Sequence, residues 1–191
     1  MFTLPPIPTW DALHPLVIHF PIALFFVAPL LVAASIFLPR KLSTGFALAA
    51  LALMVLATVS AFVAVSTGEA AGELAERWRP GVDAAIERHE DLAETARTVF
   101  TVLTGIFALL AIAPMLFTKK PISRPVIAVA YAGFLVMYAP AMILLANTAH
   151  QGGMLVHEYG VHAMLPASGS TPAAAPDYTG LPGSVRGEDD D

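Results

Sequence analysis

Histidine is the residue type in this chain whose placement indicates cofactor chemistry. His14 and His19 stand at the start of the first long apolar stretch, His89 stands alone before the third, and His150 directly follows the fourth. Neutral imidazole nitrogens bind zinc, copper and haem iron. These four histidines are therefore the candidate ligands of a haem or a metal ion.

The same residues have structural interpretations that need no ligand. The alternatives are a helix cap for His14 and His150, a hydrogen bond to a nearby carbonyl for His19, and a pairing with Glu69 or Glu73 for His89. Two further histidines beyond the last stretch, His157 and His162, are interpreted as solvated surface. The glycines after the second and fourth stretches are expected to end helices and to allow close packing: Gly68, Gly72, Gly152 and Gly153.

Composition narrows the classes of protein that could use these histidines. The 191 residues include no cysteine, which excludes disulfides, thiolate zinc sites, iron–sulfur clusters, c-type haem and a cysteine nucleophile. A formal net charge of −5 argues against a nucleic-acid partner. Hydrophobic residues make up 57% of the chain and charged residues only 13%, about half the share in a soluble domain. The chain is therefore predicted to be an integral membrane protein.

Four stretches free of Asp, Glu, Lys and Arg exceed the roughly 20 residues that cross a hydrocarbon core. They are 16–38, 42–68, 98–118 and 125–149. The two short connections after the first and third stretches carry five basic residues and no acid, whereas all 15 Asp and Glu lie elsewhere. The positive-inside rule places these connections in the cytoplasm and both termini in the periplasm. We predict an all-α, up-down-up-down four-helix bundle in the bacterial inner membrane, in contact with the lipid bilayer.

The connection 69–97 contains a predicted amphipathic helix, 82–97, that extends the third span into the periplasm. Counted from His89, positions −4, −3, +3, +4 and +7 are all apolar, which puts His89 on the buried face. The four-helix transmembrane domain is predicted to cover 1–162. Residues 163–191 are rich in Ala, Pro and Gly, end in four acids, and are predicted to form a disordered tail.

The heights of the histidines along straight helices give a first estimate of which ones can share a cofactor. At about 1.5 Å per residue from the cytoplasmic helix ends, His14 and His150 stand level at ~36 and ~37 Å. His19 lies deeper, at ~28 Å, and His89 higher, at ~44 Å. His14 with His150 is therefore the best-matched pair by depth. A weak internal repeat aligns 66–74 on 147–155 and indicates two related helical hairpins.

Several of these motifs resemble a family of bacterial membrane proteins called domain of unknown function 2231. The similar segments are HPxxxHFPI at 14–22, TGEAAG at 67–72, the isolated His89, and HQGGMLVHEYGV at 150–161. The resemblance implies a four-helix bundle with His14, His19, His89 and His150 as its matching histidines. The layout is also similar to that of small four-helix b-type cytochromes, which implies haem binding. Those cytochromes hold haems near both membrane faces, whereas here no histidine lies near the cytoplasmic side.

Three functional hypotheses follow from these observations. The first is a membrane protein that holds b-type haem at its periplasmic face and exchanges electrons with a periplasmic cytochrome or a quinone. The second is a copper or zinc site at the same place, with Glu69 as a possible oxygen ligand. The third is a non-catalytic scaffold subunit of a larger respiratory or photosynthetic membrane complex, in which the histidines are structural. No catalytic residue is assigned.

Overall fold

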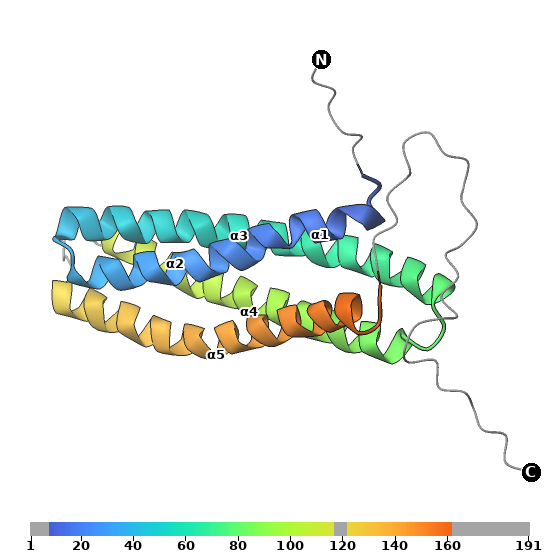
Figure 1. Ribbon diagram of the computed structural model, residues 1–191. Helices are drawn as coiled ribbons and strands as arrows, with labels where there is room; N and C mark the ends of the chain where they lie inside the picture. Colours follow the sequence, from blue (N-terminus) through green and yellow to red (C-terminus); the bar gives the residue numbers. More distant parts are fainter. Residues whose placement is uncertain (1–7, 117–121, 162–191) are drawn as a thin grey trace, which may run out of the picture.

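A computed structural model describes residues 8–116 and 122–161, and within these ranges all regular structure is helical (Figure 1). The elements are η1 (Asp11–Leu13), α1 (His14–Val17), α2 (His19–Phe37), α3 (Arg40–Trp78), α4 (Asp83–Leu116) and α5 (Arg124–His157). The predicted tail and His162 lie outside the described residues.

Four helical segments are long and apolar enough to cross a membrane, which agrees with the four predicted stretches. Three of them, α3, α4 and α5, have 39, 34 and 34 residues. Because about 20 residues span a hydrocarbon core, these helices extend well beyond their apolar parts. The predicted helix 82–97 is the beginning of α4, which continues without a break into the third apolar stretch.

The helices form a bundle in which α3 packs against α2 and α4, and α5 packs against the other sides of α4 and α2. The start of α1, the turn between α3 and α4 and the last turns of α5 lie together at one end of this bundle (Figure 1). We call this the histidine end, because His14 and His89 lie there. The opposite end holds Arg40 and Arg124, at the starts of α3 and α5, and is called the arginine end.

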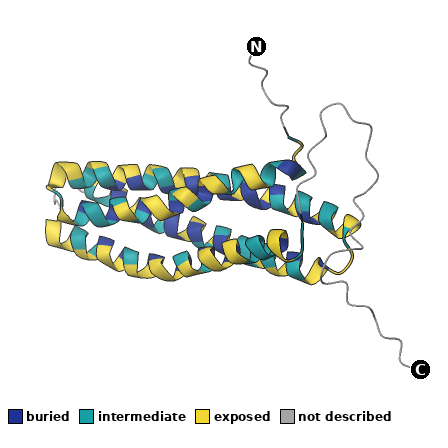
Figure 2. Cartoon of the chain, viewed as in Figure 1, coloured by how far each residue is buried: buried dark blue, intermediate teal, exposed yellow. Residues whose placement is uncertain are grey.

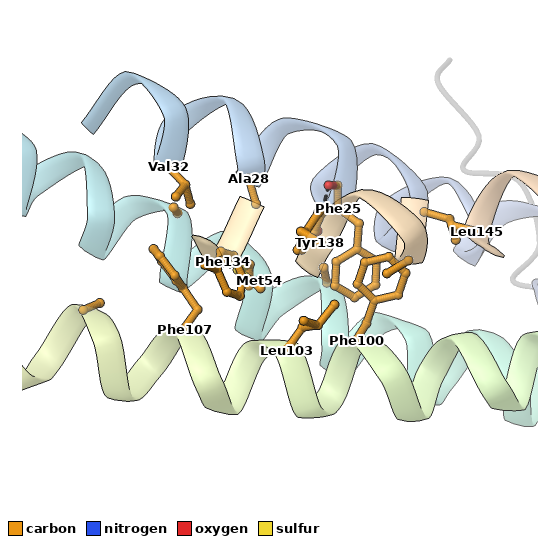
Figure 3. Packing of buried hydrophobic residues seen from close by; sticks show 14 of the residues in the cluster. Phe25, Ala28, Val32, Met54, Phe100, Leu103, Phe107, Phe134, Tyr138 and Leu145 are labelled. Carbon is orange, nitrogen blue, oxygen red and sulfur yellow. Dashed lines mark hydrogen bonds between the residues drawn. The ribbon is translucent and has the colours of Figure 1, made fainter. Parts of the chain in front are cut away.

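A column of aromatic side chains fills the middle of the bundle (Figure 3). The rings of Phe25 and Phe100 stack with centroids 4.0 Å apart, and the ring of Tyr138 meets Phe100 edge-on at 5.4 Å. The Tyr138 hydroxyl donates a hydrogen bond of 2.9 Å to the Phe25 carbonyl. This bond satisfies a polar group that would be costly in an apolar interior, and it ties α5 to α2.

Small residues line the buried face of α3, at positions 47, 50, 57, 61 and 64, all alanine. Spacings of three and four residues keep them on one side of the helix, and small side chains let helices approach closely. Large apolar side chains instead face outward, among them Leu30, Leu109 and Val136, each more than 60% exposed (Figure 2). A bundle that is apolar outside as well as inside is typical of a protein surrounded by lipid.

Candidate cofactor site

The structure brings two of the four candidate histidines into contact at the histidine end. The imidazole rings of His14 and His89 have centroids 6.4 Å apart and planes inclined at 81°. His14 is the first residue of α1, and His89 lies in the second turn of α4. The two side chains therefore come from different helices, α1 and α4, and meet inside the histidine end.

His14 is held by α3. Its Nδ1 lies 2.9 Å from the Ala64 carbonyl oxygen and 3.4 Å from Thr67 Oγ1. Because a carbonyl oxygen can only accept, the Nδ1–H of His14 donates to Ala64, and this fixes the tautomer. The ring lies against Gly68, where a Cβ would stand only 3.0 Å from His14 Cε1. Glycine at position 68 therefore makes room for the imidazole.

His89 repeats this arrangement on α5. Its Nδ1 lies 3.1 Å from the Thr148 carbonyl oxygen, to which the Nδ1–H donates. A Cβ on Gly152 would stand 2.9 Å from His89 Cε1. Both histidines thus lie near the start of a helix and donate to a carbonyl of a neighbouring helix, α3 for His14 and α5 for His89. In each case the ring also lies on the glycine four residues after that carbonyl.

These contacts support an internal repeat, in a register that differs from the predicted one. Ala64 corresponds to Thr148 and Gly68 to Gly152, an offset of 84 residues, whereas the alignment of 66–74 on 147–155 has an offset of 81. A shift of three residues is close to one helical turn and keeps the same helix face. The few identities in the sequence could not distinguish the two registers.

The four glycines do not end helices, contrary to the expectation from sequence. The helix α3 continues through Gly68 and Gly72 to Trp78, and α5 continues through Gly152 and Gly153 to His157. Packing supplies the reason for Gly68 and Gly152, because each lies directly under an imidazole ring. The expectation that glycine allows close packing is correct at these two positions and at Gly72, which the Glu90 side chain contacts.

The other described histidines differ from this pair in their exposure. His19, His150 and His157 are exposed on the described structure, whereas His14 and His89 are partly buried. The depth estimate paired His14 with His150, but the ring that contacts His14 in the structure is that of His89. Heights counted along straight, parallel helices neglect helix tilt and the several ångströms that a side chain can reach.

The alternative partners of His89 can also be compared with the structure. Its Nδ1 donates to Thr148 and not to Glu69 or Glu73, both of which are exposed. Within residues 8–116 and 122–161, no three His, Asp or Glu side chains gather closely enough to hold a metal ion. The described residues thus bring together a pair of imidazoles rather than a four-histidine cluster.

His14 and His89 lie just outside the apolar stretches, where the pKa of each is lowered, mainly because burial disfavours the charged imidazolium. The nearby charge of His14 lowers the pKa of His89 further, while the carbonyl hydrogen bonds oppose the shift in both residues. Both rings are therefore neutral near pH 7. With Nδ1–H donated to a carbonyl, the lone pair of each neutral ring is on Nε2.

Glu90, the residue after His89 in the chain, is partly buried and was not singled out from sequence. Its side chain lies against Gly72 of α3. Burial raises the pKa of Glu90, and the surrounding acids, first Glu76 and then Glu69, raise it further. Glu90 follows His89 directly and points about 100° further around the helix, so it is not among the apolar positions that mark the buried face. The one signal in the sequence was Gly72, because a glycine inside a helix can mark the close approach of a side chain from another helix.

A bundle of four apolar helices, each long enough to cross a membrane, defines the class of this chain as a multi-span membrane protein. The family described as "predicted membrane protein (DUF2231)" matches residues 10–164. The chain therefore belongs to this family, as its motifs indicated. No curated protein and no solved structure matches the chain.

Proposed function

We propose that this protein is a membrane-bound electron carrier that holds one b-type haem between His14 and His89. The observation that carries the proposal is the matched pair of neutral imidazoles, each anchored through Nδ1 and each with its Nε2 lone pair unprotonated. A histidine that binds a metal usually donates its other ring nitrogen to a carbonyl or carboxylate. The surroundings of both rings meet this requirement.

The two rings are also near enough to one another to be the residues that would hold one shared group. Their centroids are 6.4 Å apart. This proximity supports His14 and His89 as the two ligands of the proposed haem. Ligation by His19 or His150, which are exposed, stays a prediction that the variants below test.

The chain's own residues would orient and tune the group. A bound haem supplies one-electron transfer. The Ala64 and Thr148 carbonyls fix the tautomers and ring directions, and they increase the basicity of the ligating nitrogens. Gly68 and Gly152 let the rings lie close to the helix backbones. The apolar bundle beneath the pair lowers the local dielectric, which influences the reduction potential.

The proposal places the histidine end at the periplasmic face of the inner membrane. The basic residues Arg40, Lys41 and Arg124 lie at the other end, and the positive-inside rule assigns that end to the cytoplasm. The spans then run up-down-up-down, and the extensions of α3 and α4 are periplasmic. A periplasmic cytochrome or a quinone would exchange electrons with the site.

Absorption spectra of the detergent-purified protein test this proposal. Air-oxidised and dithionite-reduced wild type should show a Soret band and reduced α and β bands. His14→Asn and His89→Asn should each lose these bands and keep their helical circular dichroism, since an asparagine amide can still donate to the carbonyl but offers no second ring nitrogen. His19→Asn and His150→Asn are matched controls and should keep the bands. A colourless wild type expressed with ample haem would refute the proposal.

A copper or zinc ion is the second candidate, and one observation favours it. The two neutral imidazoles lie close together, and imidazole nitrogen is a ligand that both zinc and copper accept. Elemental analysis of the same preparation separates the two candidates. Close to one equivalent of copper or zinc, lost in His89→Asn, would replace haem by a metal ion. A colourless, metal-free protein that purifies with other chains would support the scaffold hypothesis instead.

A further inference from the structure

A small polar cavity lies at the arginine end of the bundle, among α2, α3, α4 and α5. Its volume is about 60 Å³, several times the ~10–15 Å³ that a single water needs. The polar side chains that line it are those of Ser35, Arg40, Ser43, Thr44, Arg124 and Tyr131. The space therefore suits a compact polar group rather than a bulky one.

The charge of this cavity is uncompensated. Two guanidinium groups line it and no Asp or Glu does. In the part of the chain that the structure describes, the ion pairs are Arg77 with Glu73 and Arg97 with Glu94, so neither Arg40 nor Arg124 has an acidic partner there. Both arginines are exposed, so the cavity is open to the surroundings of the bundle, and two positive charges beside it attract an anion. The cavity is thus suited to an anionic group.

The groups around the cavity are also preorganised. Arg124 Nη2 donates to the carbonyl oxygens of Phe37 and Leu38, at 3.2 and 2.6 Å, and this holds the guanidinium at the end of α2. Tyr131 is only 3% exposed, and its hydroxyl forms no hydrogen bond to any described residue. The hydroxyl oxygen is not fully enclosed, and Tyr131 lines the cavity. A bound anion would accept from this hydroxyl and from both guanidinium groups.

The position of the cavity indicates where such an anion would come from. Arg40 follows the apolar stretch 16–38 and Arg124 precedes 125–149, so both lie at the level of the lipid headgroups. Ile36, Met115 and Ile127 add apolar walls beside the arginines. Basic pockets between membrane helices on the cytoplasmic side bind anionic lipid headgroups. We propose that this cavity binds the phosphate of an anionic phospholipid, with its glycerol along the apolar wall.

Native mass spectrometry of the detergent-purified protein can test this proposal with phosphatidylglycerol and phosphatidylcholine. Wild type should retain phosphatidylglycerol in preference to phosphatidylcholine. Arg40→Gln should reduce that preference about fivefold, the loss expected for one basic residue near a headgroup. Lys41→Gln is the matched control, because Lys41 is exposed like Arg40 and lies on the same turn but does not line the cavity. Arg40 makes no side-chain bond within the described residues, so its replacement should not unfold the protein.

Three outcomes would overturn the proposal. Equal retention of the two lipids would show that the cavity does not select an anion. Equal losses in Arg40→Gln and Lys41→Gln would show that general surface charge, and not the cavity, attracts the lipid. Displacement of phosphatidylglycerol by millimolar inorganic phosphate, with no effect of the acyl chains, would assign the cavity to a free anion instead. The site is separate from the histidine pair, so the haem proposal stands or falls independently.

Discussion

Replacing Gly152 with alanine should destabilise the protein, whereas the same replacement at Gly153 should not. A Cβ at position 152 would stand 2.9 Å from His89 Cε1, and ordinary contacts begin at 3.4 Å, so the ring must retreat by about 0.5 Å. A retreat away from Thr148 would stretch the 3.1 Å hydrogen bond to about 3.6 Å, which is beyond hydrogen-bonding range. A Cβ at position 153 would meet nothing within 4 Å.

The comparison of these neighbours isolates the effect of the histidine contact. Both replacements gain the same helix propensity, up to ~1 kcal/mol. Overpacking costs about 1–3 kcal/mol, and the lost hydrogen bond contributes to that cost. We therefore expect Gly152→Ala to be less stable than Gly153→Ala by about 1–3 kcal/mol.

Unfolding of the detergent-solubilised variants, followed by circular dichroism, would measure this difference. Gly68→Ala, which faces His14 in the other half, should behave like Gly152→Ala. Equal stabilities of Gly152→Ala and Gly153→Ala would refute the idea that glycine is needed under the ring.

Three further perturbations test other parts of the structure. Tyr138→Phe removes the hydrogen bond to the Phe25 carbonyl and should cost about 0.6 kcal/mol, the average for such bonds between membrane helices, in the same unfolding assay; no loss would mean that the bond adds nothing. Phe100→Ala empties the centre of the aromatic column and should cost about 3–5 kcal/mol, and a cost below ~1 kcal/mol would contradict the packing described. The lowered pKa values of His14 and His89 mean that the folded protein binds fewer protons than the unfolded chain just below the ordinary value of 6.5. Stability should therefore be full above that pH and fall as the pH drops through the folded-state values, and unfolding measured from about pH 7.5 to pH 5 should show a smaller loss in His89→Asn than in wild type.

The elements of the fold were predictable because membrane helices have a strong local signal. Charge-free runs longer than about 20 residues require a helix, since a backbone in lipid must satisfy its own hydrogen bonds. The extension of the third span was predictable from the apolar spacing around His89, which falls in the second turn of α4. The ends of α3 and α5 were not predictable, because a glycine ends a helix in some contexts and makes room for a neighbouring side chain in others.

The two side chains that meet at the histidine end are of the residue type that the sequence singled out, but their pairing was not predictable. Sequence placed four histidines near one end of the bundle, and the structure joins His14 to His89. Helix tilt and side-chain reach shift positions by several ångströms, as much as the differences in height that the depth estimate compared. The carbonyl partners, Ala64 and Thr148, carry no sequence signal at all, because every residue has a carbonyl.

By itself, then, the sequence determined that this chain is a four-helix membrane protein of a particular family, with its histidines away from its basic turns. These properties follow from composition, periodicity and motifs, which are local along the chain. Only the tertiary structure decided which two imidazoles meet, which carbonyls fix them, and that Arg40 and Arg124 share one cavity. Such contacts join residues 50 or more positions apart, and helix packing, not local pattern, sets the distances between them.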